Sequence, residues 1–171
     1  MNSLIQRKVC MLGDFAVGKT SLVRRYVYDR FDDRYLSSIG VKVSRKDVTL
    51  DNDFNVSLLL WDLAGDMEFT GLQANYLRGT AGALLVCDLT RATTLNSIEK
   101  YAKRLRSVMP QSVVIIVGNK NDLNGQFEIQ KEEIIAMAKH LDAHFFDTSA
   151  KTGAGVEDTF HTLAQQLIEN A

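Results

Sequence analysis

The chain contains 171 residues, of which 46% are hydrophobic, and its formal net charge at pH 7 is −1. This length can bury one substantial core and is short for two, so we expect a single domain over residues 1–171. The near-zero charge provides no positive surface field, so the composition offers no support for binding to nucleic acid.

Two features of the sequence predict a cytoplasmic protein. Cys10 and Cys87 both lie inside apolar runs and are interpreted as buried, reduced thiols rather than as a disulfide. The first eight residues lack the apolar centre of a signal peptide, and Asn2 stands where myristoylation needs glycine. Because no apolar run approaches membrane-spanning length, we expect no membrane anchor in this chain.

In chain order, the first predicted unit is a strand, a glycine-containing loop and a helix. The apolar run 9–12 predicts the strand. Helical spacing of apolar residues predicts the helix, which would bury Leu22, Val23, Tyr26 and Val27.

The loop between this strand and helix, residues 13–20, has the pattern of a polyphosphate-binding loop. Gly13 and Gly18 allow backbone conformations that a side chain would block, so that N–H groups can turn inward. Lys19 can neutralise the outer phosphates, and the hydroxyl of Thr20 can reach a bridging Mg²⁺. The predicted phosphate-binding residues are Gly13, Asp14, Phe15, Ala16, Val17, Gly18, Lys19, Thr20 and Ser21. The alternative is a chance glycine-rich turn, which the flanking strand and helix signals disfavour.

The middle of the chain predicts two long loops around a hairpin. Residues 29–40 are polar and irregular, which is typical of a functional loop. Partly alternating runs at 41–50 and 56–61, joined by turn residues, predict an antiparallel hairpin. Residues 62–82 predict a second long loop with a weak helix at 73–77.

The rest of the chain alternates strands with helices. Strands are predicted at 83–88, 112–117 and 144–146, and helices at 94–107, 129–141 and 156–167. This α/β alternation predicts a mostly parallel sheet with helices on both faces. The ligand site should then lie at the carboxyl ends of the strands.

Four motifs that follow predicted strands should therefore meet at one edge of the sheet. They are Gly13-x-x-x-x-Gly18-Lys19-Thr20, Asp62-x-Ala64-Gly65, Asn119-Lys120-x-Asp122 and Ser149-Ala150-Lys151. In the order and spacing of these motifs, the chain resembles the Ras superfamily of small GTPases over nearly its whole length. Segments 38–41, 61–62 and 75–79 are most similar to the Rab branch. The resemblance implies a three-layer P-loop NTPase fold of about six strands, one of them an antiparallel edge strand.

The resemblance also implies a guanine-binding set, namely Phe31, Asn119, Lys120, Asp122, Ser149, Ala150 and Lys151. Asp122 would accept hydrogen bonds from guanine N1 and N2, which adenine cannot supply. Asn119 would brace the loop, the Lys120 stem would cover one face of the base, and Phe31 would meet it from the side. The Ala150 N–H would donate to the guanine oxygen. Taken alone, segment 119–122 could equally be an ordinary polar turn.

For the phosphates and the metal, the resemblance implies Mg²⁺ bound by Thr20, by Ser38 and, through water, by Asp62. The Gly65 N–H would contact the γ-phosphate. The implied catalytic residues are Asp66, Lys19 and Gly65. GTP and GDP would be the ligands.

Three departures from the family pattern predict slow hydrolysis. Asp66 replaces the glutamine that orients the attacking water, and an ionised carboxylate only accepts hydrogen bonds. Phe15 replaces a small residue, so its ring would fill space that an arginine finger needs. Ser38 replaces threonine and loses the packing of a methyl group. The alternatives are that Asp66 is solvated while Glu68 or a water does the positioning, and that Phe15 turns outward or packs on residues 29–40.

The main functional hypothesis is a regulatory GTPase that presents segments 29–40 and 62–77 to effectors, with possible exchange and activating factors. The alternative is a hydrolysis-deficient, GTP-bound scaffold of the same fold. A small-molecule kinase using ATP is a third possibility that would leave segment 119–122 unexplained. Rab proteins usually end in prenylated cysteines, whereas no cysteine follows Cys87 here, so we expect membrane association only if a lipidated tail was removed or through a partner.

Overall fold

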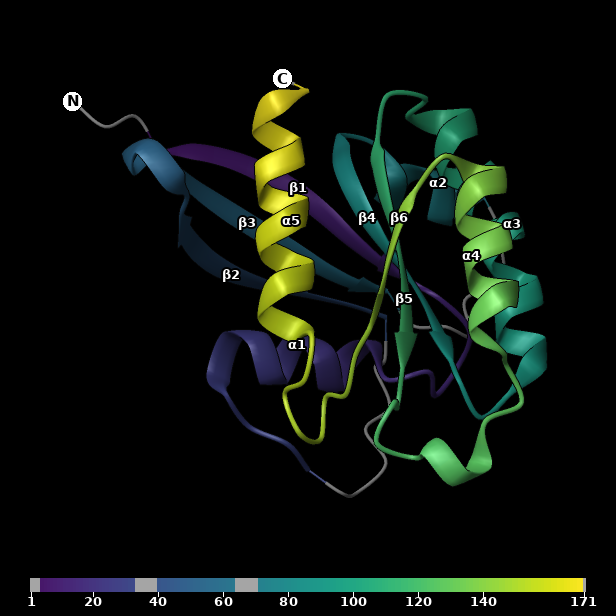
Figure 1. Ribbon diagram of the computed structural model, residues 1–171. Coiled ribbons are helices and arrows are strands. Elements are labelled where there is room, and N and C mark those ends of the chain that lie inside the picture. The colour runs from purple at the N-terminus through teal and green to yellow at the C-terminus, as the bar shows by residue number, and fades with distance from the viewer. Residues whose placement is uncertain (1–3, 33–39, 64–70, 171) are drawn as a thin grey trace.

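The structure, a computed structural model, describes residues 4–32, 40–63 and 71–170 (Figure 1). Its strands form a sheet in the order β2-β3-β1-β4-β5-β6. These strands are β1 (Ile5–Leu12), β2 (Val41–Thr49), β3 (Asn55–Leu63), β4 (Thr80–Asp88), β5 (Val113–Asn119) and β6 (His144–Asp147). Strand β2 is antiparallel to β3, and the other neighbouring pairs are parallel. The predicted mostly parallel sheet with one antiparallel edge strand is confirmed.

Helices lie on both faces of this sheet, as predicted. They are α1 (Lys19–Tyr28), α2 (Gly71–Leu77), α3 (Ala92–Val108), α4 (Lys131–Leu141) and α5 (Val156–Glu169), with single turns η1 (Asp51–Asp53) and η2 (Asn124–Gln126). Helices α1 and α5 pack on one face, whereas α2, α3 and α4 pack on the other (Figure 1). The fold is therefore a three-layer α/β/α arrangement, which fits a Ras-like G domain.

Successive side chains of the central strand β1 point to opposite faces of the sheet. Val9 and Met11 point to the core under α1 and α5, whereas Cys10 and Leu12 point to the core under α3 and α4. Both cores are closed by apolar stripes on the helices. A parallel ladder that is covered on both faces needs such a continuous apolar run, which the sequence shows at 9–12.

Strand β1 begins four residues earlier than predicted because polar residues also join its ladder. Residues 5–8 pair in parallel with residues 56–59 of β3. Lys8 lies over the Trp61 ring, 3.8 Å from its centroid, and donates to the carbonyls of Tyr76 and Arg78. The long side chain thus satisfies its charge at the sheet surface, which an apolar-run criterion does not detect.

Helix α4 begins two residues later than predicted, and its cap gives the reason. The Gln130 side chain accepts from the Glu133 backbone, and the Glu133 carboxylate accepts from the Gln130 N–H at 2.7 Å. This reciprocal capping box starts the helix at Lys131. Ile129 is buried ahead of the cap, so it contributes to the core without belonging to the helix.

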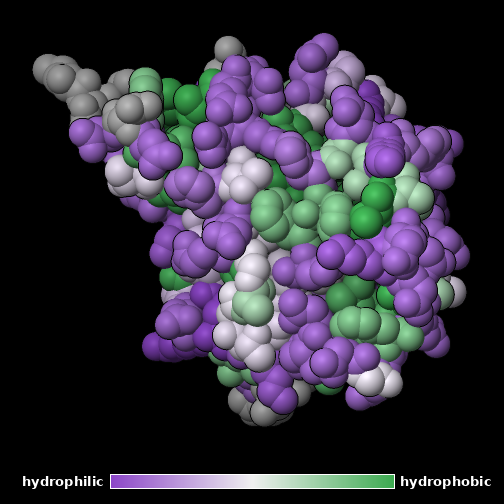
Figure 2. All heavy atoms as spheres, viewed as in Figure 1, coloured by the Kyte–Doolittle hydropathy of each residue, from purple (hydrophilic) through white to green (hydrophobic). Residues whose placement is uncertain are grey.

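On the surface, hydrophilic side chains predominate on the face seen in Figure 2, with hydrophobic side chains in patches between them. Cys10 and Cys87 are both buried free thiols, as predicted, and burial raises the pKa of Cys87 to about 12. Across the described part of the chain, each helix is too short or too polar to span a lipid bilayer.

Candidate functional site

The phosphate loop connects the end of β1 to the start of α1, and glycine is required at both of its ends. A Cβ at Gly13 would lie 2.3 Å from the carbonyl oxygen of Val86. At Gly18 the backbone is left-handed, with φ of +102°, and a Cβ would lie 2.2 Å from Nδ2 of Asn119. The loop therefore passes closer to β4 and β5 than any side chain at these positions would permit.

Lys19 and Thr20 form the first turn of α1, at the mouth of this loop. The buried Lys19 ammonium lies across the loop and donates to the carbonyl oxygens of Gly13 at 2.9 Å and Asp14 at 3.2 Å. Ser21 is the next residue of the helix and is half-buried. The positive charge is thus held where the N–H groups of the loop and the helix N-terminus also favour an anion.

A hydroxyl and a carboxylate meet beside this turn. Thr20, at the start of α1, donates to Oδ2 of Asp62 near the end of β3 at 2.5 Å. The Asp62 side chain is 2% exposed. Oxygen ligands of this kind are those that Mg²⁺ prefers, so the pair fits the expected metal. Ser38, Gly65 and Asp66, the other residues predicted here, lie outside the described residues.

Asn119, at the end of β5, connects the phosphate loop to the loop after β6. Its Nδ2 donates to the carbonyl oxygen of Val17 at 3.0 Å. Its Oδ1 accepts from the Thr148 hydroxyl at 3.0 Å and from the Ala150 N–H at 3.4 Å. One buried amide therefore ties together three segments that are far apart in the sequence.

Lys120 makes a second connection to the phosphate loop. Its Nζ donates to the carbonyl oxygen of Ala16 at 3.0 Å and pairs with Oδ2 of Asp88 at 2.8 Å. Burial opposes ionisation of Asp88, but hydrogen bonds from Lys120 and Thr90 outweigh it and lower the pKa of this carboxyl. The lysine stem is thereby held between the end of β4 and the loop at 13–18.

Asp122 and Ser149 lie next to each other at the same edge. The Ser149 hydroxyl donates to Oδ1 of Asp122 at 2.8 Å and accepts from the Thr152 N–H at 3.0 Å. The carboxylate is thus oriented by the loop after β6. Lys151 in that loop is exposed, as is Phe31 beyond the end of α1.

Phe15, the bulky residue of the phosphate loop, is 48% exposed. Its carbonyl oxygen accepts a hydrogen bond from Nη2 of Arg91 at 2.8 Å, so its backbone is tied to the start of α3. Asp66, the catalytic residue whose space the ring was predicted to fill, and residues 33–39 of the segment on which it could pack lie outside the described residues.

Several residues at this edge were missed by sequence reasoning. They are Arg25, Asp88, Arg91, Ser97, Tyr101 and Thr148. Asp88 could have been found, because it ends the predicted strand 83–88, at the edge where the other site residues follow their strands. Arg25 and Tyr101 gave no such signal, since each lies within a helix whose spacing indicates only amphipathicity.

Comparison with known proteins confirms the resemblance drawn from the motifs. Residues 8–169 match the model of the Ras family. The Ras-related protein Rab-31 of Rattus norvegicus, Mus musculus and Homo sapiens is 34% identical over 168 residues, which cover 98% of this chain and 86% of the relative. Members of this family are GTPase switches that bind GTP or GDP with Mg²⁺ and interact with effectors and with exchange or activating factors. The chain belongs to the Ras family of small GTPases and is Rab-like.

Proposed function

We propose that residues 1–171 form a single GTPase domain that binds GTP and GDP with Mg²⁺, hydrolyses GTP slowly and presents segments 29–40 and 62–77 to effectors. The Asn119 amide is the observation that carries this proposal. It joins the phosphate loop at Val17 to the loop at Ala150 through hydrogen bonds of 3.0 and 3.4 Å. A phosphate site and a base site are therefore held at a fixed spacing, as one nucleotide requires.

At the phosphate end, the N–H groups of residues 13–18 and the Lys19 ammonium bind the phosphates. Thr20 and Ser38 would hold the metal, and Asp62 would do so through water. When bound, the metal would supply positive charge that offsets the negative charge of the phosphates. The adjacency of Thr20 and Asp62 supports this assignment.

At the base end, Asp122 selects guanine by accepting hydrogen bonds from its N1 and N2 groups. Ser149 holds the carboxylate in place with its 2.8 Å hydrogen bond. The Ala150 N–H donates to the guanine oxygen, and the Lys120 stem covers a face of the base. Phe31 and Lys151 complete the border of the site. Adenine lacks these two donor groups, so its binding would lose their hydrogen bonds to the carboxylate, which favours GTP over ATP.

Slow hydrolysis is proposed from the identities of the residues that the family resemblance assigns to the γ-phosphate. Lys19 and the Gly65 N–H stabilise charge there, but Asp66 cannot donate a hydrogen bond to the attacking water while it is ionised. Phe15 adds bulk where an arginine finger would enter, and such a finger contributes about 10³–10⁵ in rate where it is used. Intrinsic and stimulated turnover are therefore both low.

Single-turnover hydrolysis of bound GTP tests this diagnosis. We expect Asp66→Gln combined with Phe15→Gly to raise the rate constant by about tenfold or more, since a positioned proton-transfer group contributes about 10²–10⁴ in favourable cases. Glu68→Gln is the matched control and should leave the slow rate unchanged. A rate that falls in Glu68→Gln and is unmoved in the double variant would contradict the proposed role of Asp66. Absence of any turnover in both would favour the alternative of a GTP-bound scaffold.

A further inference from the structure

We infer that Arg25 is a positioning residue for guanine recognition. From helix α1 it holds the turn that contains Ala150, whose N–H donates to the guanine oxygen. Its Nε donates to the carbonyl oxygen of Ala150 at 2.8 Å, and its Nη2 donates to that of Lys151 at 2.6 Å. These bonds join positions 125 and 126 residues apart. The inference rests on the proposed function, because it concerns the base end of that site.

The geometry matches the particular shape of an arginine side chain. Two donors of the planar guanidinium take two consecutive carbonyl oxygens, which a lysine ammonium cannot do with the same directionality. The third nitrogen, Nη1, donates to Asp29 at 3.0 Å, and the arginine side chain is only 19% exposed. The guanidinium is therefore held mainly by the two carbonyl oxygens, and the exposed Asp29 carboxylate adds a solvent-screened contact.

The stem of Arg25 lies next to the turn at Gly153. Gly153 has a left-handed backbone with φ of +86°, and a Cβ there would lie 3.7 Å from Cδ of Arg25. The turn is closed by the Gly153 N–H, which donates to the carbonyl oxygen of Ser149 at 2.8 Å. The arginine stem thus packs beneath a closed turn rather than along an open loop.

The direction of the Ala150 N–H depends on what holds the peptides on either side of it. On one side, its hydrogen bond to Oδ1 of Asn119 is long, 3.4 Å, and that oxygen also accepts from the Thr148 hydroxyl at 3.0 Å. On the other side, the carbonyl oxygen of Ala150 is held by Arg25 at 2.8 Å. Without Arg25 the two peptides that follow Ala150 each lose a side-chain hydrogen bond. The N–H is then held only from the other side, by the long bond to Asn119 and by the Gly153 N–H on the Ser149 carbonyl, so the turn can shift it away from the base.

Arg25 therefore connects the two ends of the nucleotide through one helix. Helix α1 begins with Lys19 and Thr20 at the phosphate loop, and Arg25 follows within the next two turns. A rigid helix that starts at one end of the ligand and supports the turn at the other end fixes their separation. The base-reading N–H is thus positioned by the same element as the phosphate-binding lysine.

Three nucleotides separate this role from a general effect on folding. GDP offers all three base contacts, 6-thio-GDP keeps N1–H and the 2-amino group but has a weakly accepting sulfur, and IDP keeps the oxygen but lacks the 2-amino group. Their Kd values are measured by competition with a fluorescent GDP analogue for the full chain and for Arg25→Ala. We expect Arg25→Ala to weaken GDP binding about threefold to tenfold, which corresponds to one hydrogen bond.

The decisive readout is the pair of selectivity ratios. The preference for GDP over 6-thio-GDP should fall by the same factor, because Arg25→Ala weakens the hydrogen bond from the Ala150 N–H to the oxygen at C6. The preference for GDP over IDP should stay unchanged, because Asp122 is untouched. Arg25→Lys should show the same pattern with smaller changes in Kd. If Arg25→Ala does not fold, Arg25→Lys is used for the test instead.

Arg24→Ala is the matched control, since it removes the same charge from the neighbouring position of α1. Among the residues that the structure describes, none is hydrogen-bonded by Arg24, so all three Kd values should be unchanged. An equal loss for all three nucleotides in the Arg25 variants, or no loss, would overturn the inference while leaving the proposed function intact. Equal binding of ADP and GDP by the unchanged chain would overturn both.

Discussion

At the scale of single residues, the buried carboxylate of Asp88 holds two cationic side chains, those of Lys120 and Arg91, that contact the phosphate loop. Its carboxylate lies at the end of β4, 2% exposed, and accepts from Lys120 at 2.8 Å and from Arg91 at 3.1 Å. The Thr90 backbone and hydroxyl complete its partners at 2.9 and 2.6 Å. Because its partners include two cations, the ionised form is retained despite burial.

The expected consequence is a pH-dependent contribution to stability. The folded-state pKa of Asp88 is lowered, so its contribution is complete above the ordinary carboxyl pKa of about 3.9 and is lost as pH falls below it. At pH 7, Asp88→Asn should lower the free energy of unfolding by about 1–3 kcal/mol, because two cations lose a charged partner. Urea unfolding at fixed GDP concentration should show this difference shrinking as pH falls below about 4. A difference that is constant with pH would contradict it, and the exposed Asp51→Asn serves as control.

At the scale of elements, helix α3 holds the phosphate loop from the side opposite α1. Ser97 and Tyr101, one helical turn apart, donate to the two carboxylate oxygens of Asp14 at 2.6 and 3.0 Å. Arg91, just before the helix, adds the bond to the carbonyl oxygen of Phe15 at 2.8 Å. Burial and the nearby Asp14 charge raise the pKa of Tyr101, so its hydroxyl stays a donor at physiological pH. The loop is thus clamped to a helix that itself belongs to the core.

We therefore expect Tyr101→Phe to loosen the phosphate loop while keeping the buried ring. Removing the hydroxyl should lower the free energy of unfolding by about 0.5–1.5 kcal/mol and speed GDP release severalfold. Release is followed by stopped flow with a fluorescent GDP analogue. Tyr28→Phe removes the hydroxyl from an exposed tyrosine and should change neither quantity. Unchanged release in Tyr101→Phe would show that α3 does not hold the loop.

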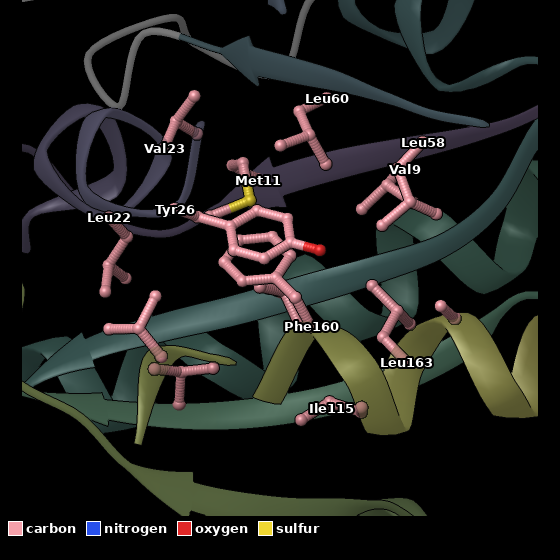
Figure 3. Close-up of a cluster of buried hydrophobic side chains, with 14 of the residues drawn as sticks. Val9, Met11, Leu22, Val23, Tyr26, Leu58, Leu60, Ile115, Phe160 and Leu163 are labelled. Carbon is pink, nitrogen blue, oxygen red and sulfur yellow. The ribbon is translucent and has the colours of Figure 1, made fainter. Parts of the chain in front are cut away.

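At the scale of the whole molecule, two helices distant in the sequence close one core over the sheet. The rings of Tyr26 in α1 and Phe160 in α5 stack with centroids 3.9 Å apart and planes 1° from parallel. Figure 3 shows this pair among Met11, Val9 and Leu163, which come from β1 and α5. The C-terminal helix thereby fixes the helix that carries Lys19 and Arg25.

Removing the Phe160 ring should destabilise the molecule as a whole. Phe160 is 1% exposed, so Phe160→Ala should lower the free energy of unfolding by about 3–5 kcal/mol through reduced apolar burial and cavity formation. Phe54→Ala removes the same side chain from a site that is 51% exposed and should change stability by less than about 0.5 kcal/mol. Chemical denaturation of both variants measures the contrast. A decrease below about 1 kcal/mol for Phe160→Ala would mean that the core collapses to fill the space.

Much of this protein was predictable from local pattern. The alternation of apolar runs with helical periods predicted the parallel sheet, because a strand covered on both faces must be apolar along its length. The loop 13–20 predicted a phosphate site because few residue types can bring backbone N–H groups to an anion. The remaining motifs were expected to form one site with it, since all of them follow strands that end at one edge, and their resemblance to the Ras superfamily indicated guanine.

Other features could be known only after the chain was folded. Asp88 with Lys120, Asp14 with Tyr101, and Arg25 with Ala150 are contacts between residues 32, 87 and 125 positions apart. Even where the position of a side chain at the end of a strand was visible in the sequence, as for Asp88, its neighbours along the chain do not show whether it meets one of these distant partners or stays an ordinary polar residue. Which one applies is decided by sheet order and helix packing, because these bring distant side chains within hydrogen-bonding distance and exclude the water that would otherwise replace them.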